Sequence, residues 1–243
     1  MRIIGFHGLR EGAGASFVSA SCACRMTVTS GRVLAVDAHP CVSSMNRLFN
    51  LPLRVHKGWL EAAAGNSDAL PLWRYTEKLD VLPAGRLNRA ATTALWTQCF
   101  GWLIEQARLL QYDALVIDAG PVSSPASRAL RAAREVLSVT IVEPDASCLA
   151  RLVDHEFGES ELLLLNKTNA ASAAHKSVML VMNKVDAISR RLIPVSIPWD
   201  EFVLEACLVK RPVVDGLSFA QSAESINNLV SWLDSFARNA GAV

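Results

Sequence analysis

Short, largely apolar runs separated by amphipathic stretches dominate the pattern of hydrophobic and polar positions along this chain. The apolar runs span residues 2–6, 32–37, 79–85, 112–121, 136–145, 162–167 and 192–198. A strand in a parallel sheet is covered by helices on both faces, so its sequence is apolar throughout rather than alternating. Strands that alternate with helices therefore predict an α/β fold with a mostly parallel, doubly wound sheet flanked by helices.

Helical spacing is clearest in residues 91–111, where Leu95, Cys99 and Leu103 share one face. Further helices are predicted over 17–24, 42–49, 57–62, 124–134, 146–155, 172–189, 201–209 and 223–238. The last of them offers only Arg238 as a basic residue opposite its apolar side. Because a helix at a membrane surface carries several basic residues there, packing on the sheet is favoured.

Composition narrows the class of protein. The 243 residues show no shift in composition, which predicts a single domain over 1–243, and a net charge of +1 gives no reason to expect a nucleic-acid partner. The six cysteines include no CxxC pair, as expected for reduced thiols. No apolar run reaches the length of a membrane span and no signal peptide is evident, so we expect a cytoplasmic protein that reaches a membrane only through a partner.

Residues 8–16, with the sequence GLREGAGAS, join the first predicted strand to the first predicted helix. A glycine loop in this place is typical of a phosphate-binding loop, where backbone N–H groups surround an anion. Gly12 and Gly14 leave room for phosphate oxygens, whereas Ala15 stands where a lysine normally precedes the serine. Glu11 would repel a phosphate unless Arg10 neutralises it. We therefore expect weak or conditional nucleotide binding rather than efficient hydrolysis.

Two aspartates, Asp37 and Asp118, close predicted strands. The carboxyl ends of parallel strands meet at the edge of the sheet where α/β proteins bind their ligands. Carboxylate and hydroxyl oxygens suit Mg²⁺, so Ser16, Asp37 and Asp118 are the candidate metal ligands.

Residues 183–186, Asn-Lys-Val-Asp, imitate the guanine-reading NKxD motif of GTPases. That interpretation requires a strand over 178–182. The apolar positions from Val178 to Leu192 also fit helical spacing, which favours a helix and makes the motif a coincidence. An active GTPase remains the less favoured alternative.

The loop and the two aspartate-bearing strands resemble the deviant-Walker ATPases of the MinD/ParA type, whose loop reads KGGxGK[ST]. By this resemblance Arg10 stands at the signature lysine, Glu11 and Gly12 at the glycine pair, Gly14 at the last glycine, Ala15 at the phosphate lysine and Ser16 at the metal-binding hydroxyl. The resemblance also implies that Ala13, Phe17, Asn166 and Pro198 contact the nucleotide.

Other parts of the active site are matched in the same way. Asp37 matches the first aspartate of the DxD segment, and Asp118 matches the Walker B carboxylate. His39 replaces the second aspartate, which positions the attacking water in the ATPases. The resemblance therefore implies a slow or inactive ATPase and no catalytic residue.

A more specific resemblance covers nearly the whole chain. Residues 36–40, 58–59, 74–85, 190–194 and 205–213 are similar to the BcsQ family, the MinD-like proteins of bacterial cellulose-secretion operons. It implies a Rossmann-like P-loop domain of the SIMIBI class that binds ATP and Mg²⁺ and dimerises across its nucleotide face. The implied partners are other proteins of the operon, namely a small BcsR-like protein and the cyclic di-GMP-responsive cellulose synthase at the inner membrane.

Two mechanisms follow from the resemblance. In the first, weakly bound ATP bridges two subunits, and the paired surface docks partners that assemble, localise or regulate the synthase. In the second, favoured by Glu11, the chain is a pseudo-ATPase scaffold that binds no nucleotide.

Overall fold

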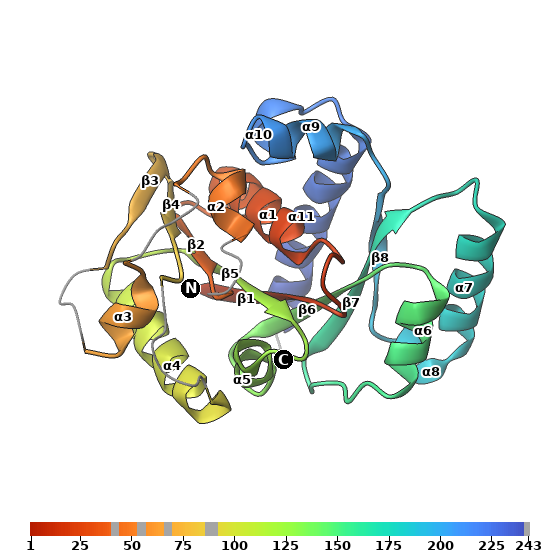
Figure 1. Cartoon of the computed structure of the whole chain (residues 1–243), viewed down its shortest axis with the longest axis horizontal. Helices are drawn as coiled ribbons and strands as arrows, with labels where there is room; N and C mark the ends of the chain where they lie inside the picture. The colour runs from red at the N-terminus through yellow and green to blue at the C-terminus, as the bar shows by residue number, and fades with distance from the viewer. Residues whose placement is uncertain (40–43, 53–56, 66–69, 86–91, 241–243) are drawn as a thin grey trace.

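A computed structural model describes residues 1–39, 44–52, 57–65, 70–85 and 92–240 (Figure 1). Its centre is one eight-stranded sheet with the order β3-β4-β2-β5-β1-β6-β7-β8. The strands are β1 (Arg2–Gly8), β2 (Val33–Asp37), β3 (Trp73–Thr76), β4 (Leu79–Leu82), β5 (Ala114–Pro121), β6 (Leu137–Val142), β7 (Glu161–Thr168) and β8 (Leu192–Pro198). Every neighbouring pair is parallel except β3 with β4. The mostly parallel sheet is thus confirmed.

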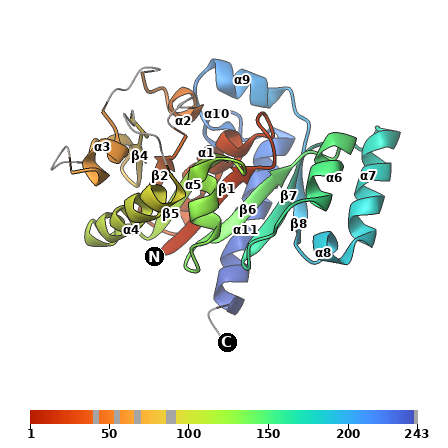
Figure 2. The ribbon, with the colours of Figure 1, turned by 60° about the horizontal axis from the view of Figure 1, so that its bottom comes forward.

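Helices cover both faces of the sheet (Figure 2). On one face pack α1 (Ala15–Thr29), α2 (Ser44–Leu48), α9 (Phe202–Leu208), α10 (Val213–Gly216) and α11 (Gln221–Ala240). On the other pack α3 (Trp59–Ala63), α4 (Thr93–Leu109), α5 (Pro125–Arg131), α6 (Ala146–Val153), α7 (Ala173–Lys184) and α8 (Asp186–Ser189). In β1, for example, Ile4 and Phe6 join the first layer and Ile3 the second, because successive side chains of a strand point to opposite faces.

The closing helix packs on the sheet, as its polar face predicted. Ile226, Leu229 and Leu233 of α11 are buried against the same core as α1. Among the described residues, no helix has the length and apolar character needed to cross a membrane.

The structure departs from the predicted elements in three places. The strand β3 was not predicted, because it is an antiparallel edge strand whose residues are mostly exposed and no apolar run marks it. The helix predicted over 172–189 is interrupted at Val185, whose extended backbone separates α7 from α8. The short helix α10 was not predicted either, since a single turn that follows Pro212 carries too little periodicity. Some positions named in the predictions lie outside the described residues. They are Pro40, Cys41, the first two residues of the helix predicted over 42–49, and Ala91 of the helix predicted over 91–111.

Candidate functional site

The glycine-rich segment joins β1 to α1, as predicted. Gly12 has φ 79° and Gly14 has φ 100°, left-handed values that glycine adopts without strain. Gly14 immediately precedes α1, and no side chain caps the first turn of that helix. The N–H groups at this helix start are thereby left for an anion, and the helix dipole favours negative charge there.

A cavity of about 700 Å³ opens over this loop. One wall consists of the loop itself and the residues that follow it, as far as Phe17. The facing wall comes from α2 and α9, and the cavity is completed by the segment that follows β2 and by the end of β5. Outside the loop, the lining residues are His39, Arg47, Leu48, Gly120, Pro121, Leu204, Cys207 and Leu208. The space is large enough for a small-molecule ligand.

Two buried carboxylates adjoin this cavity. Asp37 and Asp118 are direct neighbours in the register of β2 and β5. The backbone N–H groups of His39 and Gly120 donate to one oxygen of each, at 2.8 and 3.2 Å respectively. The second oxygen of each has no hydrogen-bond partner within the described part of the chain.

The electrostatics of this pair favour a cation. Burial and then the charge of Asp118 raise the pKa of Asp37 to about 8. Burial also raises the pKa of Asp118, against the opposing effect of the Ser16 hydroxyl. Because two adjacent buried carboxylates repel each other when ionised, a divalent ion beside them would stabilise both charges. Their unpartnered oxygens and the hydroxyl of Ser16 fit Mg²⁺, which takes its remaining ligands from water and phosphate.

The two charged side chains of the loop do not pair with each other. The guanidinium of Arg10 pairs with Glu143 and with Asp145, the latter at 3.0 Å, rather than with the exposed Glu11. Ala15 is the first residue of α1 and carries no charge into the cavity. The condition under which Arg10 would neutralise Glu11 is therefore not met.

Comparison with known proteins identifies the family. The sequence profile described as "Cellulose biosynthesis protein BcsQ" matches residues 1–233. The chain belongs to the BcsQ family. Cellulose biosynthesis protein BcsQ of Escherichia coli (strain K12) is 29% identical over 246 residues, which cover 96% of this chain and 94% of the relative. The BcsQ protein of Salmonella typhi is 26% identical over 243 residues, with the same coverage.

Solved structures place this BcsQ-family chain in a wider fold. MinD from Pyrococcus horikoshii OT3, complexed with Mg-ADP, matches with a TM-score of 0.73 and 20% identity over 97% of both chains. The MinC:MinD complex of Aquifex aeolicus matches with a TM-score of 0.76 and 16% identity, covering 97% of this chain and 96% of that one. The fold is thus that of the MinD/ParA P-loop proteins, as the resemblance implied.

Two other residues matched to the nucleotide site lie off the cavity lining. Asn166, near the end of β7, is buried and its amide donates to the Ala13 carbonyl at 2.7 Å. Pro198 ends β8, where it pairs with Thr168. The structure brings Asn166 to the loop itself, whereas the partner of Pro198 is a residue of the neighbouring strand β7.

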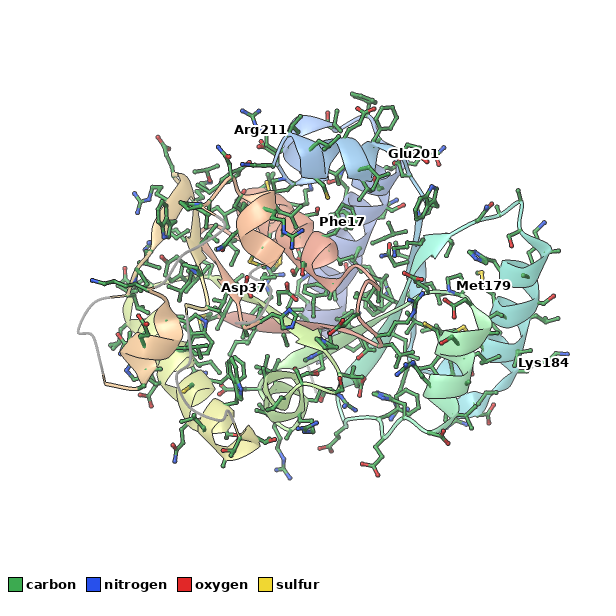
Figure 3. The ribbon with its side chains drawn as sticks, in the orientation of Figure 1. Phe17, Asp37, Met179, Lys184, Glu201 and Arg211 are labelled. Carbon is green, nitrogen blue, oxygen red and sulfur yellow. The ribbon has the colours of Figure 1, made fainter. Side chains whose placement is uncertain are left out.

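The NKxD-like segment proves to be helical. Residues 178–182 lie within α7, where the Asn183 amide donates to the Met179 carbonyl, and Asp186 is exposed at the start of α8. Met179 and Lys184 lie on the opposite side of the molecule from Asp37 (Figure 3). The helix is confirmed, and the GTPase interpretation that required a strand here is wrong.

Sequence reasoning missed three charged residues near the loop. Glu143 follows β6 and Lys167 belongs to β7, so their positions at the carboxyl ends of predicted strands were the available signal. Arg47 lines the cavity from α2 and forms no ion pair or hydrogen bond with another described residue. No motif in the sequence marked it.

Proposed function

We propose that this member of the BcsQ family binds Mg²⁺-ATP weakly and acts in cellulose biosynthesis as a nucleotide-stabilised pair of subunits. The paired surface would dock other proteins of the cellulose machinery, a small BcsR-like protein and the synthase at the inner membrane, and so assemble, localise or regulate the synthase. The observation that carries this proposal is the pair of unpartnered carboxylate oxygens beside a glycine loop with uncapped N–H groups. Such an arrangement suits a metal-bound phosphate.

In this proposal Ser16, Asp37 and Asp118 hold Mg²⁺, directly or through water. The ion, when bound, supplies positive charge that offsets the phosphates of the nucleotide. The loop amides bind phosphate oxygens. Arg47, on the facing wall, can approach them directly, since it forms no ion pair with another residue that the structure describes.

Slow or absent turnover is part of the proposal. Ala15 offers no charge to a developing phosphate anion, and the His39 ring takes the place where ATPases of this type have a water-positioning aspartate. The ring packs against Gly120, where an added Cβ would lie 3.0 Å from it. With two groups of the catalytic set replaced, the bound nucleotide acts mainly as a stabiliser of one conformation.

Pairing of two copies is supported by apolar side chains next to the cavity. Leu204 and Leu208 of α9 line it and are both exposed in the single chain. Exposed leucines at the rim of a ligand site are typical of a surface that another protein covers.

The test is calorimetric titration of the purified protein with ATP and Mg²⁺, together with its mass in solution with and without nucleotide. We expect weak binding accompanied by a shift from monomer to dimer. Hydrolysis at about 1 per second or faster, an ordinary enzyme rate, would contradict the proposal that the nucleotide acts as a clamp.

A pseudo-ATPase scaffold without nucleotide is the second candidate. Its support is that Arg10 pairs with Glu143 and Asp145, which leaves the Glu11 charge on the loop unneutralised. No binding at millimolar ATP and an unchanged mass would favour this candidate.

A further inference from the structure

A lysine of β7, two strands away from β1 in the sheet, is bound to the glycine loop. Lys167, in β7, has a left-handed backbone with φ 55°, an uncommon value for a residue other than glycine. Its Nζ donates to the Gly12 carbonyl at 2.6 Å and also pairs with Glu143. Glu143 in turn pairs with Arg10. The Glu143 carboxylate thus connects Arg10 of the loop with Lys167 of β7.

This contact acts together with the preceding residue. Asn166 holds the Ala13 carbonyl and Lys167 holds the Gly12 carbonyl, so two consecutive carbonyls of the loop are bound from β7. In a trans peptide the next N–H points opposite to the C=O. Holding the Ala13 carbonyl against β7 therefore directs the Gly14 N–H away from β7. Asn166 and Lys167 thus orient the loop through two of its carbonyls.

The charges of the ion-paired cluster beside the loop balance only when Lys167 is counted. Arg10 and Lys167 face Glu143 and Asp145, two positive against two negative groups. Glu143 is largely buried, so its charge is poorly screened by water. Without Lys167 that carboxylate would repel a phosphate and would hold Arg10 alone.

We propose that Lys167 is the positioning residue that lets this loop accept a nucleotide phosphate although Ala15 has replaced the usual lysine. It neutralises Glu143 and orients the loop through Gly12, and it does so from outside the loop. This role rests on the proposed nucleotide binding and extends it, since the positive charge that compensates for Ala15 comes from Lys167 of β7.

The first test compares Lys167→Met, Lys167→Arg and Lys184→Met, the last an exposed lysine on α7. The dissociation constants for Mg²⁺-ATP and for inorganic pyrophosphate are measured, together with thermal unfolding. We expect Lys167→Met to weaken the binding of both ligands about tenfold, because the variant loses the charge-assisted contacts of Lys167 with Gly12 and Glu143. Lys167→Arg should restore most of the affinity, and Lys184→Met should bind as the unmodified protein does. Unchanged binding in Lys167→Met would overturn the role.

A second readout separates charge from general structural damage. The double variant Glu143→Gln with Lys167→Met removes both charges and should recover part of the lost affinity. A double variant no better than Lys167→Met would overturn the electrostatic role.

Hydrogen exchange of amides 12–16 in the ligand-free protein tests the tether independently of nucleotide. We expect faster exchange in Lys167→Met but not in Lys184→Met, and equal exchange would overturn the tether. Failure of the unmodified protein to bind ATP would overturn the proposed function instead, while the exchange experiment still decides the role of Lys167.

Discussion

Single residues determine how strongly the loop attracts a phosphate. Ala15 removes one charge from the loop, and the remaining nearby cations are either paired, as Arg10 and Lys167 are, or on the facing wall, as Arg47 is. The backbone N–H groups remain available because they depend on the glycines rather than on side-chain charge. Weak binding is the expected result of keeping the amides and losing the lysine.

Restoring that charge should strengthen binding. Ala15 lines the cavity, so the side chain in Ala15→Lys can extend into it. One charge-assisted contact is worth about 1.5–3 kcal/mol, or roughly a 10- to 150-fold gain in affinity for Mg²⁺-ATP. Titration calorimetry would measure it, with Ala15→Met as the uncharged control. Equal affinity in the two variants would show that the loop does not present position 15 to a phosphate.

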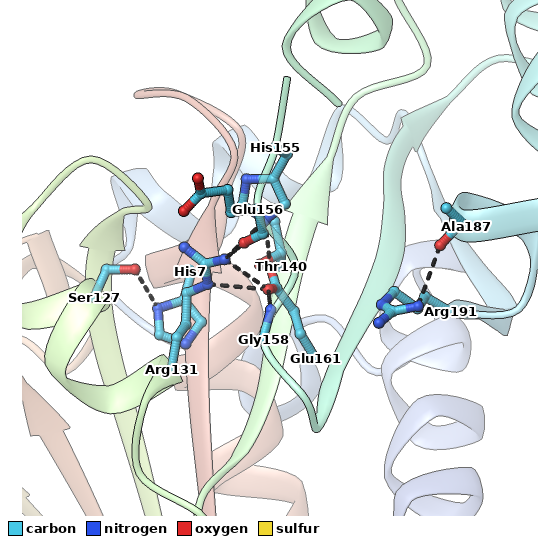
Figure 4. A network of polar contacts seen from close by, with 10 residues as sticks. All are labelled: His7, Ser127, Arg131, Thr140, His155, Glu156, Gly158, Glu161, Ala187 and Arg191. Carbon is cyan, nitrogen blue, oxygen red and sulfur yellow. Dashed lines mark hydrogen bonds and ion pairs between the residues drawn. The ribbon is translucent and has the colours of Figure 1, made fainter. Parts of the chain in front are cut away.

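At the scale of elements, a buried polar network joins α5, two strands and the segment that follows α6 (Figure 4). Glu161 of β7 accepts hydrogen bonds from Arg131 of α5 at 3.0 Å, from Thr140 of β6 at 2.5 Å and from the Gly158 N–H at 2.7 Å. His155, which follows α6, lies 2.8 Å from it. These hydrogen bonds and the charge of Arg131 hold the pKa of Glu161 at about 2, against the effect of burial.

The network makes stability depend on pH. The carboxyl pKa is lower in the folded chain than in the unfolded one, so its contribution is complete above about pH 5 and is lost as the pH falls toward 2. His7 adds to this loss, because burial lowers its pKa to about 3. As the pH falls below the ordinary pKa of 6.5, this histidine binds a proton in the unfolded chain but not in the folded chain, so the unfolded chain is favoured.

Glu161→Gln should therefore lower the free energy of unfolding by about 3–5 kcal/mol at pH 7, since it leaves Arg131 buried without its counter-charge. The difference from the unmodified protein should shrink between pH 5 and pH 2. Denaturant titrations at several pH values measure it. Glu135→Gln, which breaks an exposed pair with Arg108, is the control and should cost less than about 1 kcal/mol. A constant difference at every pH would contradict the assignment of the acid sensitivity to Glu161.

At the scale of the whole molecule, the order of strands gathers the site. β1, β2 and β5 lie side by side in the sheet although β2 and β5 are far apart in the sequence, and their carboxyl ends bring the loop, Asp37 and Asp118 together. The segment that follows β8 then returns over this edge of the sheet and forms α9, whose exposed leucines line the cavity. The proposed pairing of subunits thus involves residues from both ends of the chain.

This geometry predicts a variant that separates pairing from folding. Leu208 is 81% exposed on α9, and Leu109, at the end of α4 on the other face of the sheet, is 74% exposed. Leu208→Glu should abolish the nucleotide-dependent increase in mass, because a charge would be buried in the pair, and Leu109→Glu should leave it intact. Light scattering with and without Mg²⁺-ATP measures both. A dimer that persists in Leu208→Glu would place the pairing surface elsewhere.

The sequence alone determined the fold class, most of the helices and strands, the glycine loop between β1 and α1, and the placement of Asp37 and Asp118 at strand ends. These features are local: apolar periodicity, glycines at a fixed spacing and carboxylates that end buried runs are all encoded within a few neighbouring residues. Local patterns did not predict β3, because this exposed edge strand forms only by pairing with β4.

Only the tertiary structure decided which charges meet at the loop. Arg10, Glu143 and Lys167 come from three separate parts of the chain, and their pairing depends on the strand order β1-β6-β7 in the sheet. No spacing in the sequence links them, since an ion pair depends on distance in space and not on separation along the chain. The arrangement of strands is therefore what ties Lys167 to a loop that begins 159 residues before it, at Gly8.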